Sequence, residues 1–156
     1  MAERLTAALP ATVDLHVLHG ELPLEEQDAA LRPAPAGRRK VVLATTVAET
    51  SLTIEGVRVV IDGGLSRVPR FDPASGLTRL ATVKVSKSSA EQRRGRAGRV
   101  EPGVCYRLWD EEQTRGLVPH QKPEIQEADL TAFALDLARW GARSVEGLAL
   151  LDPPPA

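Results

Sequence analysis

The sequence predicts an α/β fold in which helices flank a mostly parallel sheet. Apolar runs of strand length alternate with short helical segments over the first two thirds of the chain, which is typical of βαβ units. Two strand-like arms at residues 65–86 depart from this alternation and predict an inserted antiparallel β-hairpin. The C-terminal end predicts a short helical segment. With 156 residues, of which 42% are hydrophobic, the chain can form one domain with a small appendage.

Helix and strand alternate along the first part of the chain. Ala2–Leu9 predicts a short helix that ends before a proline, and Val13–Leu18 predicts a strand. Leu24–Leu31 predicts a helix that ends in the proline- and glycine-rich loop 32–37. Val41–Ala44 is a short apolar run, as expected of a strand buried on both faces of a parallel sheet.

The middle of the chain predicts another buried strand at Val57–Ile61, followed by the hairpin. Two arms within Leu65–Ser86 flank Asp72–Gly76, whose proline and glycine favour a turn. Pro69 has no backbone donor, so its arm is expected to be an edge strand or to project from the sheet. An ordinary surface hairpin is one interpretation, and a functional projection is another.

Three elements are predicted in the last part of the chain. Ala90–Gly98 predicts a helix and Gly103–Trp109 the last strand. Ala128–Trp140 predicts an amphipathic helix, because its apolar residues recur at helical spacing. These apolar residues are Leu130, Phe133, Ala134, Leu137 and Trp140.

The octapeptide QRRGRAGR contains four arginines and two glycines. A guanidinium group is planar, always charged and able to bind phosphate oxygens with two donors. On a helix, Arg96 and Arg99 would share a face with Gln92 one turn earlier, and would present an amide and two cations to a polyphosphate. Gly95 and Gly98 would let the backbone approach a ligand or another lobe closely. By itself, such a segment also fits a solvated basic face or an RNA-binding stripe.

A cluster of hydroxyl groups follows the predicted strand Val41–Ala44. Thr45 and Thr46 come first, at the carboxyl end of the strand, where open α/β sheets bind ligands. Further polar residues follow at Glu49, Thr50, Ser51 and Thr53. Hydroxyls and amides can contact a nucleic-acid backbone without reading its sequence, although serine and threonine also cap helices.

Together, TTVAETSLTI and QRRGRAGR resemble motifs V and VI of the second RecA-like lobe of DEAH-box helicases, in helicase superfamily 2. HGELPLEEQ resembles the stretch after motif IV of that family, and KPEI and LDPPP resemble its passage into the winged-helix region. The resemblance covers nearly all of the chain. VPRFDP and the terminal DPPP are most similar to the bacterial HrpB-type branch.

The resemblance implies a RecA-like fold with three parts. Residues 1–122 would form the second RecA-like domain without its first strand, and residues 65–86 the inserted hairpin. Residues 123–156 would begin the winged-helix region. By position between motifs V and VI, the hairpin would project toward the nucleic acid and help to separate strands.

The resemblance also implies which residues bind the phosphates of a nucleotide. Arg96 and Arg99 would be arginine fingers that contact the β- and γ-phosphates, and Gln92 would orient the attacking water or the γ-phosphate. Further nucleotide-binding positions would be Ser51, Thr53, Glu55, Leu31 and Gly95. The family often has phenylalanine where this chain has Leu31, so stacking on adenine would be lost.

Nucleic-acid contacts are implied at Thr45, Thr46 and Arg70. The family usually reads Thr-Asn where this chain has Thr45–Thr46, so one amide contact would be missing. The implied partners are RNA, possibly DNA, and the first RecA-like lobe of the same polypeptide. The implied cofactors are ATP and Mg²⁺, held mainly by that first lobe.

Two motifs needed for phosphoryl transfer are absent from the sequence. It contains neither G-x-x-x-x-G-K-[ST], which cradles phosphates, nor Asp-Glu-Ala-His, whose carboxylates hold the metal. We therefore expect the C-terminal lobe of an ATP-dependent helicase that does not hydrolyse ATP alone. The alternative is a free-standing nucleic-acid-binding or regulatory module without catalysis.

Charge and composition are consistent with a nucleic-acid partner. The net charge is −1, but residues 84–99 hold six basic residues and one acidic residue. His16 and His19 lie three apart in a predicted strand and would point to opposite faces, so no metal site is expected. Cys105 is expected to be a buried, inert thiol. No apolar run of membrane length and no signal peptide occur, and we expect a cytoplasmic protein with no membrane contact.

Overall fold

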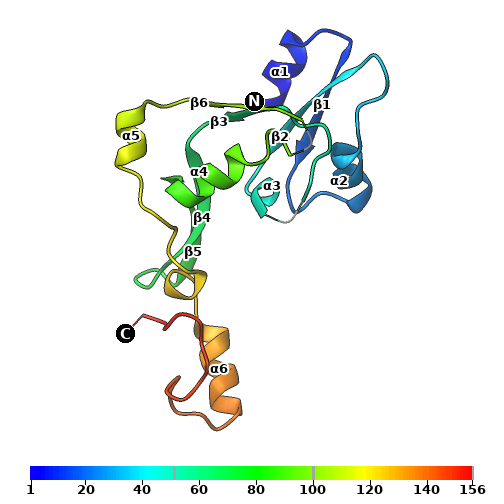
Figure 1. The fold of residues 1–156 in the computed structure, drawn as a ribbon. Helices are drawn as coiled ribbons and strands as arrows, with labels where there is room; N and C mark the ends of the chain where they lie inside the picture. The colour runs from blue at the N-terminus through cyan, green and yellow to red at the C-terminus, as the bar shows by residue number, and fades with distance from the viewer. Residues whose placement is uncertain (51, 100, 156) are drawn as a thin grey trace.

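The computed structural model describes residues 1–50, 52–99 and 101–155. Its elements are arranged in three groups (Figure 1): an N-terminal pair of strands with helices α1 and α2, a second pair of strands with helix α4, and a long hairpin that runs toward the C-terminal helix. The helices and strands of all three groups overlap segments for which the sequence predicts the same kind of element. The α/β class, the parallel strands and the inserted antiparallel hairpin are confirmed.

The N-terminal group consists of α1 (Ala2–Ala8), β1 (Val13–Leu18), α2 (Leu24–Leu31) and β2 (Arg39–Ala44). β1 and β2 pair in parallel, from Val13 opposite Arg39 to Leu18 opposite Ala44. Leu18 and Ala30 are fully buried where α2 packs on β1. The Nζ of Lys40 in β2 donates hydrogen bonds to the carbonyls of Ala30 and Arg32, which ties the end of α2 to the strand.

The second group consists of β3 (Val59–Asp62), α4 (Lys87–Arg94) and β6 (Val104–Arg107). β3 and β6 pair in parallel, and α4 packs against β3. The short helix α3 (Val47–Thr50) directly follows β2 and contacts α4, so it connects the first two groups.

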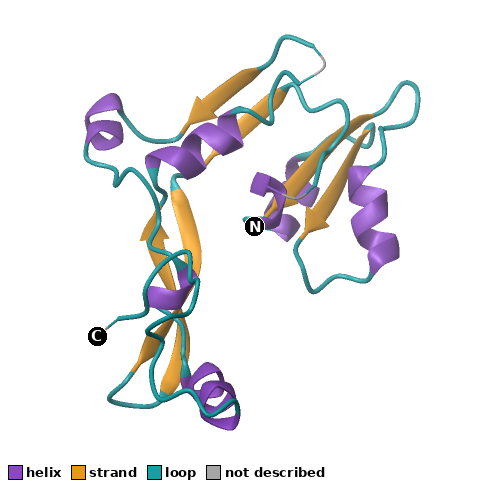
Figure 2. Cartoon of the chain, turned by 60° about the horizontal axis from the view of Figure 1, so that its bottom comes forward, coloured by secondary structure: helices purple, strands orange, loops and turns teal. Residues whose placement is uncertain are grey.

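The hairpin is formed by β4 (Leu65–Asp72) and β5 (Leu77–Lys84), which pair from Leu65 opposite Lys84 to Asp72 opposite Leu77. The predicted turn is confirmed: Asp72 accepts hydrogen bonds from Ala74 N and Ser75 Oγ, and Gly76 has a φ of 65°. Figure 2 shows the hairpin extending away from the β3–β6 pair.

The hairpin is anchored where it leaves the second group. Val85, Ala90 and Leu117 are buried against the half-buried Trp109. Gly64, with a φ of 71°, lies so close to Trp109 that a Cβ would come within 2.8 Å of the ring. This small core holds the base of the hairpin, the start of α4 and the segment after β6 together.

The C-terminal part contains α5 (Glu111–Arg115), a 3-10 helix (Glu124–Gln126) and α6 (Thr131–Arg139). No element was expected at α5, which begins after Asp110, whose carboxylate accepts a hydrogen bond from Gln113 N. The helix expected at 128–140 is present as α6 but is shorter at both ends.

Three further expectations about the fold are wrong in detail. The parallel strands form two separate sheets in the described part of the chain, because β2 and β3 share no ladder, and β2 is half-buried rather than buried on both faces. The helix expected at 90–98 starts earlier, at Lys87, and ends at Arg94. Ser86 begins it by accepting a hydrogen bond from Ser89 N at 3.2 Å, and Gly95 ends it.

Candidate functional site

Two segments that the sequence analysis singled out lie against each other. We call residues 45–55, after β2, the threonine segment, and residues 92–99, at the end of α4 and after it, the arginine segment. Arg96 donates to the backbone carbonyl of Leu52 at 2.9 Å and to that of Glu49. Arg99 donates to Thr53 Oγ1 at 2.9 Å. The fold therefore joins two sequence motifs about forty residues apart into one site.

The arginines do not reach this site from a helix face. Because α4 ends at Arg94, Arg96 and Arg99 lie in the turns that follow, and the helical spacing expected for them is wrong. Gly98 has a φ of 82°, and a Cβ there would come within 2.9 Å of Gly103 N. The close approach that this glycine permits is therefore to the backbone before β6, within the same chain.

Arg99 is close enough to Arg96 to act on its pKa. Burial and the positive charge of Arg99 lower the pKa of Arg96 below its ordinary value. Arg96 is half-buried and Arg99 is exposed. Two neighbouring guanidinium groups, one of them accessible, are of the chemical type that binds phosphate oxygens.

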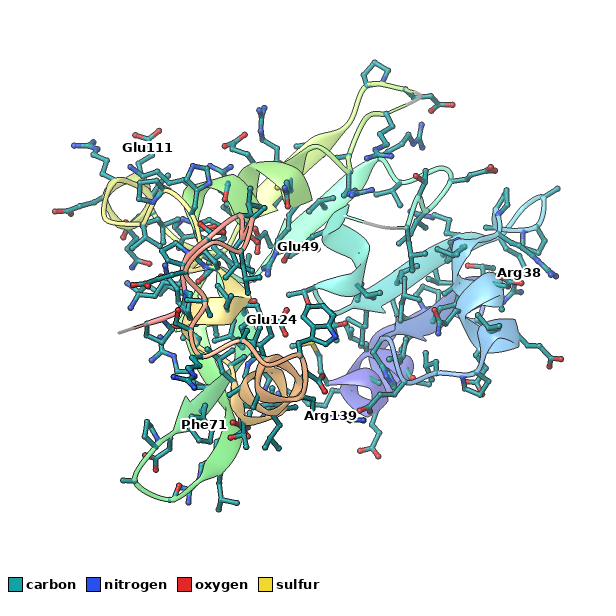
Figure 3. The ribbon with its side chains drawn as sticks, turned by 90° about the horizontal axis from the view of Figure 1, so that it is seen from below. Arg38, Glu49, Phe71, Glu111, Glu124 and Arg139 are labelled. Carbon is teal, nitrogen blue, oxygen red and sulfur yellow. The ribbon has the colours of Figure 1, made fainter. Side chains whose placement is uncertain are left out.

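Arg93 and Glu49 form a second set of contacts between the two segments. Arg93 donates from Nε to Glu49 Oε1 at 2.7 Å and from Nη1 to Asp62 Oδ1 at 2.8 Å. Ser89 Oγ donates to the other oxygen of Glu49 at 2.6 Å. In the view of Figure 3, Glu49 lies near the centre of the molecule, between the N-terminal group and α4.

The sequence analysis did not assign functions to Arg93, Glu49 or Asp62. A signal was available for Asp62, which is a carboxylate at the end of the apolar run VVID and therefore needs a partner if that strand is buried. Its cationic partner lies 31 residues away in sequence, and local patterns contain no information about that pairing.

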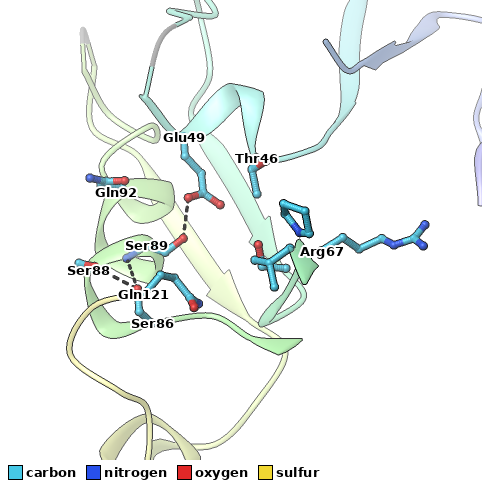
Figure 4. Close-up of a pocket in the computed structure, with 11 residues that line it drawn as sticks. Thr46, Glu49, Arg67, Ser86, Ser88, Ser89, Gln92 and Gln121 are labelled. Carbon is cyan, nitrogen blue, oxygen red and sulfur yellow. Dashed lines mark hydrogen bonds between the residues drawn. The ribbon is translucent and has the colours of Figure 1, made fainter. Parts of the chain in front are cut away.

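An open pocket of about 400 Å³ lies between the threonine segment, the start of α4 and the base of the hairpin (Figure 4). Thr46 and Gln92, both exposed, line it together with Ser66, Arg67 and Ser88. The structure thus brings one predicted RNA-contact residue and one predicted catalytic residue to the same cavity.

Other predicted residues are more widely distributed. Thr45 is exposed directly after β2, and its backbone N donates to the carbonyl of Leu18. Glu55 is exposed, and its negative charge acts on Lys40, whose pKa is lowered chiefly by burial. Leu31 is half-buried at the end of α2.

Three predicted positions remain, Gly95, Ser51 and Arg70. Gly95 ends α4 with ordinary helical dihedral angles. Ser51 lies outside the described residues. Arg70 is exposed on β4, and its Nε lies 3.7 Å from a carboxylate oxygen of Glu127, so the phosphate contact predicted for it would compete with an ion pair.

Three further features of the described residues concern metal binding, membrane crossing and the cysteine. These residues contain no group of three or more His, Cys, Asp or Glu side chains that could hold a metal ion. No helix among them is long and apolar enough to cross a membrane. Cys105 in β6 is half-buried, so the expectation of a buried thiol is wrong; its partial burial still raises the pKa of the thiol above the ordinary value, which disfavours the reactive thiolate.

Comparison with known proteins agrees with this geometry. Residues 1–101 match the helicase conserved C-terminal domain family. The chain is 48% identical over 153 residues to the ATP-dependent RNA helicase HrpB of Escherichia coli (strain K12), covering 98% of this chain and 19% of HrpB. It is 42% identical over 156 residues to the pre-mRNA-splicing factor ATP-dependent RNA helicase prp22 of Schizosaccharomyces pombe, covering 99% of this chain and 13% of prp22.

A solved structure extends the likeness to three dimensions. The crystal structure of the Escherichia coli DEAH/RHA helicase HrpB superposes with a TM-score of 0.93 at 47% identity, over 99% of this chain and 20% of that chain. The chain thus spans about a fifth or less of the relatives described here. The family match, the two motifs and the shared fold show that this chain belongs to the helicase conserved C-terminal domain family, in its DEAH/RHA branch.

Proposed function

We propose that this chain is the second RecA-like lobe of an ATP-dependent RNA helicase of the DEAH type. The observation that carries the proposal is the pair Arg96 and Arg99, held by the threonine segment at the carboxyl end of β2. Residues 1–122 form the RecA-like domain, with the hairpin inserted at 65–86 and a winged-helix region beginning at residue 123.

In this proposal the nucleotide binds where this lobe faces the first lobe of the same polypeptide. Bound ATP with Mg²⁺ supplies the phosphoanhydride bond whose hydrolysis drives the helicase. Arg96 and Arg99 bind the β- and γ-phosphates, and Gln92 orients the γ-phosphate or the water. Thr53 and Glu55, together with Leu31, Ser51 and Gly95, contact the rest of the nucleotide. The proximity of the two arginine charges supports this, because a polyphosphate would relieve their mutual repulsion.

RNA, with DNA as the alternative, binds at the pocket shown in Figure 4, which Thr46 lines. Thr45 and Thr46 hold the backbone through their hydroxyl groups and the amide of Thr46, since the amide of Thr45 donates to the carbonyl of Leu18, and these contacts do not read the RNA sequence. Arg70 reaches a phosphate once its ion pair with Glu127 opens. A cytoplasmic location stays a prediction.

The isolated chain is expected to lack ATPase activity, because the phosphate cradle and the metal-binding carboxylates belong to the first lobe. Phosphate release by the purified 156-residue chain is measured with and without RNA, alongside the Arg99→Ala variant. Turnover above background that disappears in the variant would contradict the proposed division of labour between the lobes.

A further inference from the structure

The side chain of Arg93, near the end of α4, bonds to residues that are distant from it in sequence. Its side chain reaches three elements: Glu49 in α3, Asp62 at the end of β3, and the backbone carbonyl of Leu65 at the start of β4, at 3.1 Å from Nη1. The side chains of Arg93, Glu49 and Asp62 are only 17%, 12% and 0% exposed. These contacts are therefore largely shielded from water.

The chemistry of the cluster requires an arginine. A buried cation is costly unless carboxylates compensate it, and here two do. The planar guanidinium donates in several fixed directions, so one group can hold acceptors from three elements in a defined arrangement. Burial by itself lowers the pKa of Arg93, but its hydrogen bonds to Asp62 and Glu49 raise the pKa above the ordinary value, so the residue stays charged.

Each contact of Arg93 adjoins a part of the proposed site. The backbone carbonyl of Glu49 accepts from Arg96, and its backbone N donates to the carbonyl of Thr46 at 2.9 Å. Leu65 is the first residue of the hairpin. Arg93 itself lies three residues before Arg96. It is thus bonded to the residues that hold the predicted finger, the predicted RNA contact and the base of the hairpin.

We propose that Arg93 is a positioning residue that couples RNA bound at the threonine segment and the hairpin to the orientation of Arg96. The inference rests on the proposed function. A shift of the hairpin base moves Leu65 and Asp62, which pull on Arg93, and through Glu49 the shift reaches the carbonyl that holds Arg96. A buried ion-pair network with fixed geometry transmits such a shift because it does not deform smoothly.

The test uses the full-length helicase that contains this chain. Variants are Arg93→Lys, Glu49→Gln, their combination, and Arg94→Ala as the matched control. Arg94 is the neighbouring arginine on α4, and its side chain is 64% exposed in a surface pair with Glu91. For each variant, thermal unfolding, ATPase rates with and without RNA, and the KM for ATP are measured.

A lysine keeps the charge, but its compact ammonium lacks the planar fork that holds the acceptors of three elements in fixed directions. We expect Arg93→Lys to reduce the stimulation of ATPase by RNA about two- to thirtyfold, the range typical of coupling residues, with little change in the KM for ATP. Glu49→Gln should do the same, and the double variant should be no worse than the worse single variant, because both act through one contact. Arg94→Ala should match the wild type.

Three outcomes would overturn the inference: wild-type stimulation in Arg93→Lys, an equal loss of the stimulated and unstimulated rates, or additive effects in the double variant. If Arg93→Lys does not fold, Glu49→Gln decides by the same readouts, because it preserves the shape of the side chain and its acceptor for Ser89. Absence of RNA-stimulated hydrolysis in the wild type would instead contradict the proposed function.

Discussion

Each arginine of the arginine segment has its own surroundings, and these surroundings separate four roles. Arg93 is buried between two carboxylates, and Arg94 is exposed beside Glu91. Arg96 is half-buried and bonded to two backbone carbonyls, whereas Arg99 is exposed and bonded to a threonine hydroxyl. Substitutions at these four positions should therefore have very different effects, although the residue type is the same.

Removal of Arg96 should impair catalysis in the full-length helicase much more than removal of Arg94. Loss of an arginine finger typically lowers kcat by ~10³–10⁵. Arg96→Lys should be almost as damaging as Arg96→Ala, because a point charge does not reproduce the fork that binds two acceptors. Steady-state ATPase kinetics of the three variants test this order. A larger defect in Arg94→Ala than in Arg96→Ala would show that the assignment of roles is wrong.

Among the elements, the β4–β5 hairpin has few ties to the rest of the molecule along most of its length. Phe71 N donates to the carbonyl of Glu127, Arg70 pairs with Glu127, and Gln121 donates to the carbonyl of Lys84 near the base. Figure 1 shows the hairpin leaving the parallel strands and approaching the C-terminal helix. Its base contacts the site through Leu65, whereas its tip is distant from the arginine segment.

Shortening the hairpin around Asp72–Gly76 should therefore separate two activities. We expect RNA-stimulated ATPase to be retained, because the turn makes its hydrogen bonds within itself and the base of the hairpin stays intact. Strand displacement should fall, because the projecting arms would no longer meet the junction of duplex and single strand. Both activities are measured on the same full-length variant. Equal loss of both would mean that the hairpin is only structural.

At the scale of the whole molecule, the β3–β6 sheet has one apolar face without cover in the described part of the chain. Register places Val59 opposite Val104 and Ile61 opposite Tyr106, and all four side chains are between 43% and 68% exposed. Exposed apolar side chains that adjoin one another favour association with another surface. The separate two-stranded sheets also leave edges that can pair with another chain.

The isolated 156-residue chain should consequently self-associate at micromolar concentrations. Ile61→Lys, at a side chain that is 68% exposed, should weaken this association without unfolding the chain. Sedimentation velocity over a concentration series measures the association, and circular dichroism checks the fold. A wild-type chain that stays monomeric throughout would show that the apolar face and the sheet edges are tolerated in water.

Local sequence patterns were sufficient to predict the α/β class, the hairpin with its turn at 72–76, and the two motifs. Each of these depends on local patterns: apolar runs set strands, proline and glycine set the turn, and the spacing of residue types within ten positions sets the motifs. Element ends were less accurate. The end of α4 at Gly95 depends on how the following turns pack, with Gly98 against Gly103, and no residue pattern within the helix specifies it.

The contacts between side chains that are distant in sequence became evident only from the folded chain. Arg93 contacts Glu49 and Asp62 across 44 and 31 residues of sequence, and Arg96 and Arg99 bind carbonyl and hydroxyl groups of the threonine segment instead of sharing a helix face. The physical reason is that these contacts arise from the packing of α3, α4 and β3 on one another. Packing over such separations depends on the path of the whole chain, which local propensity does not encode.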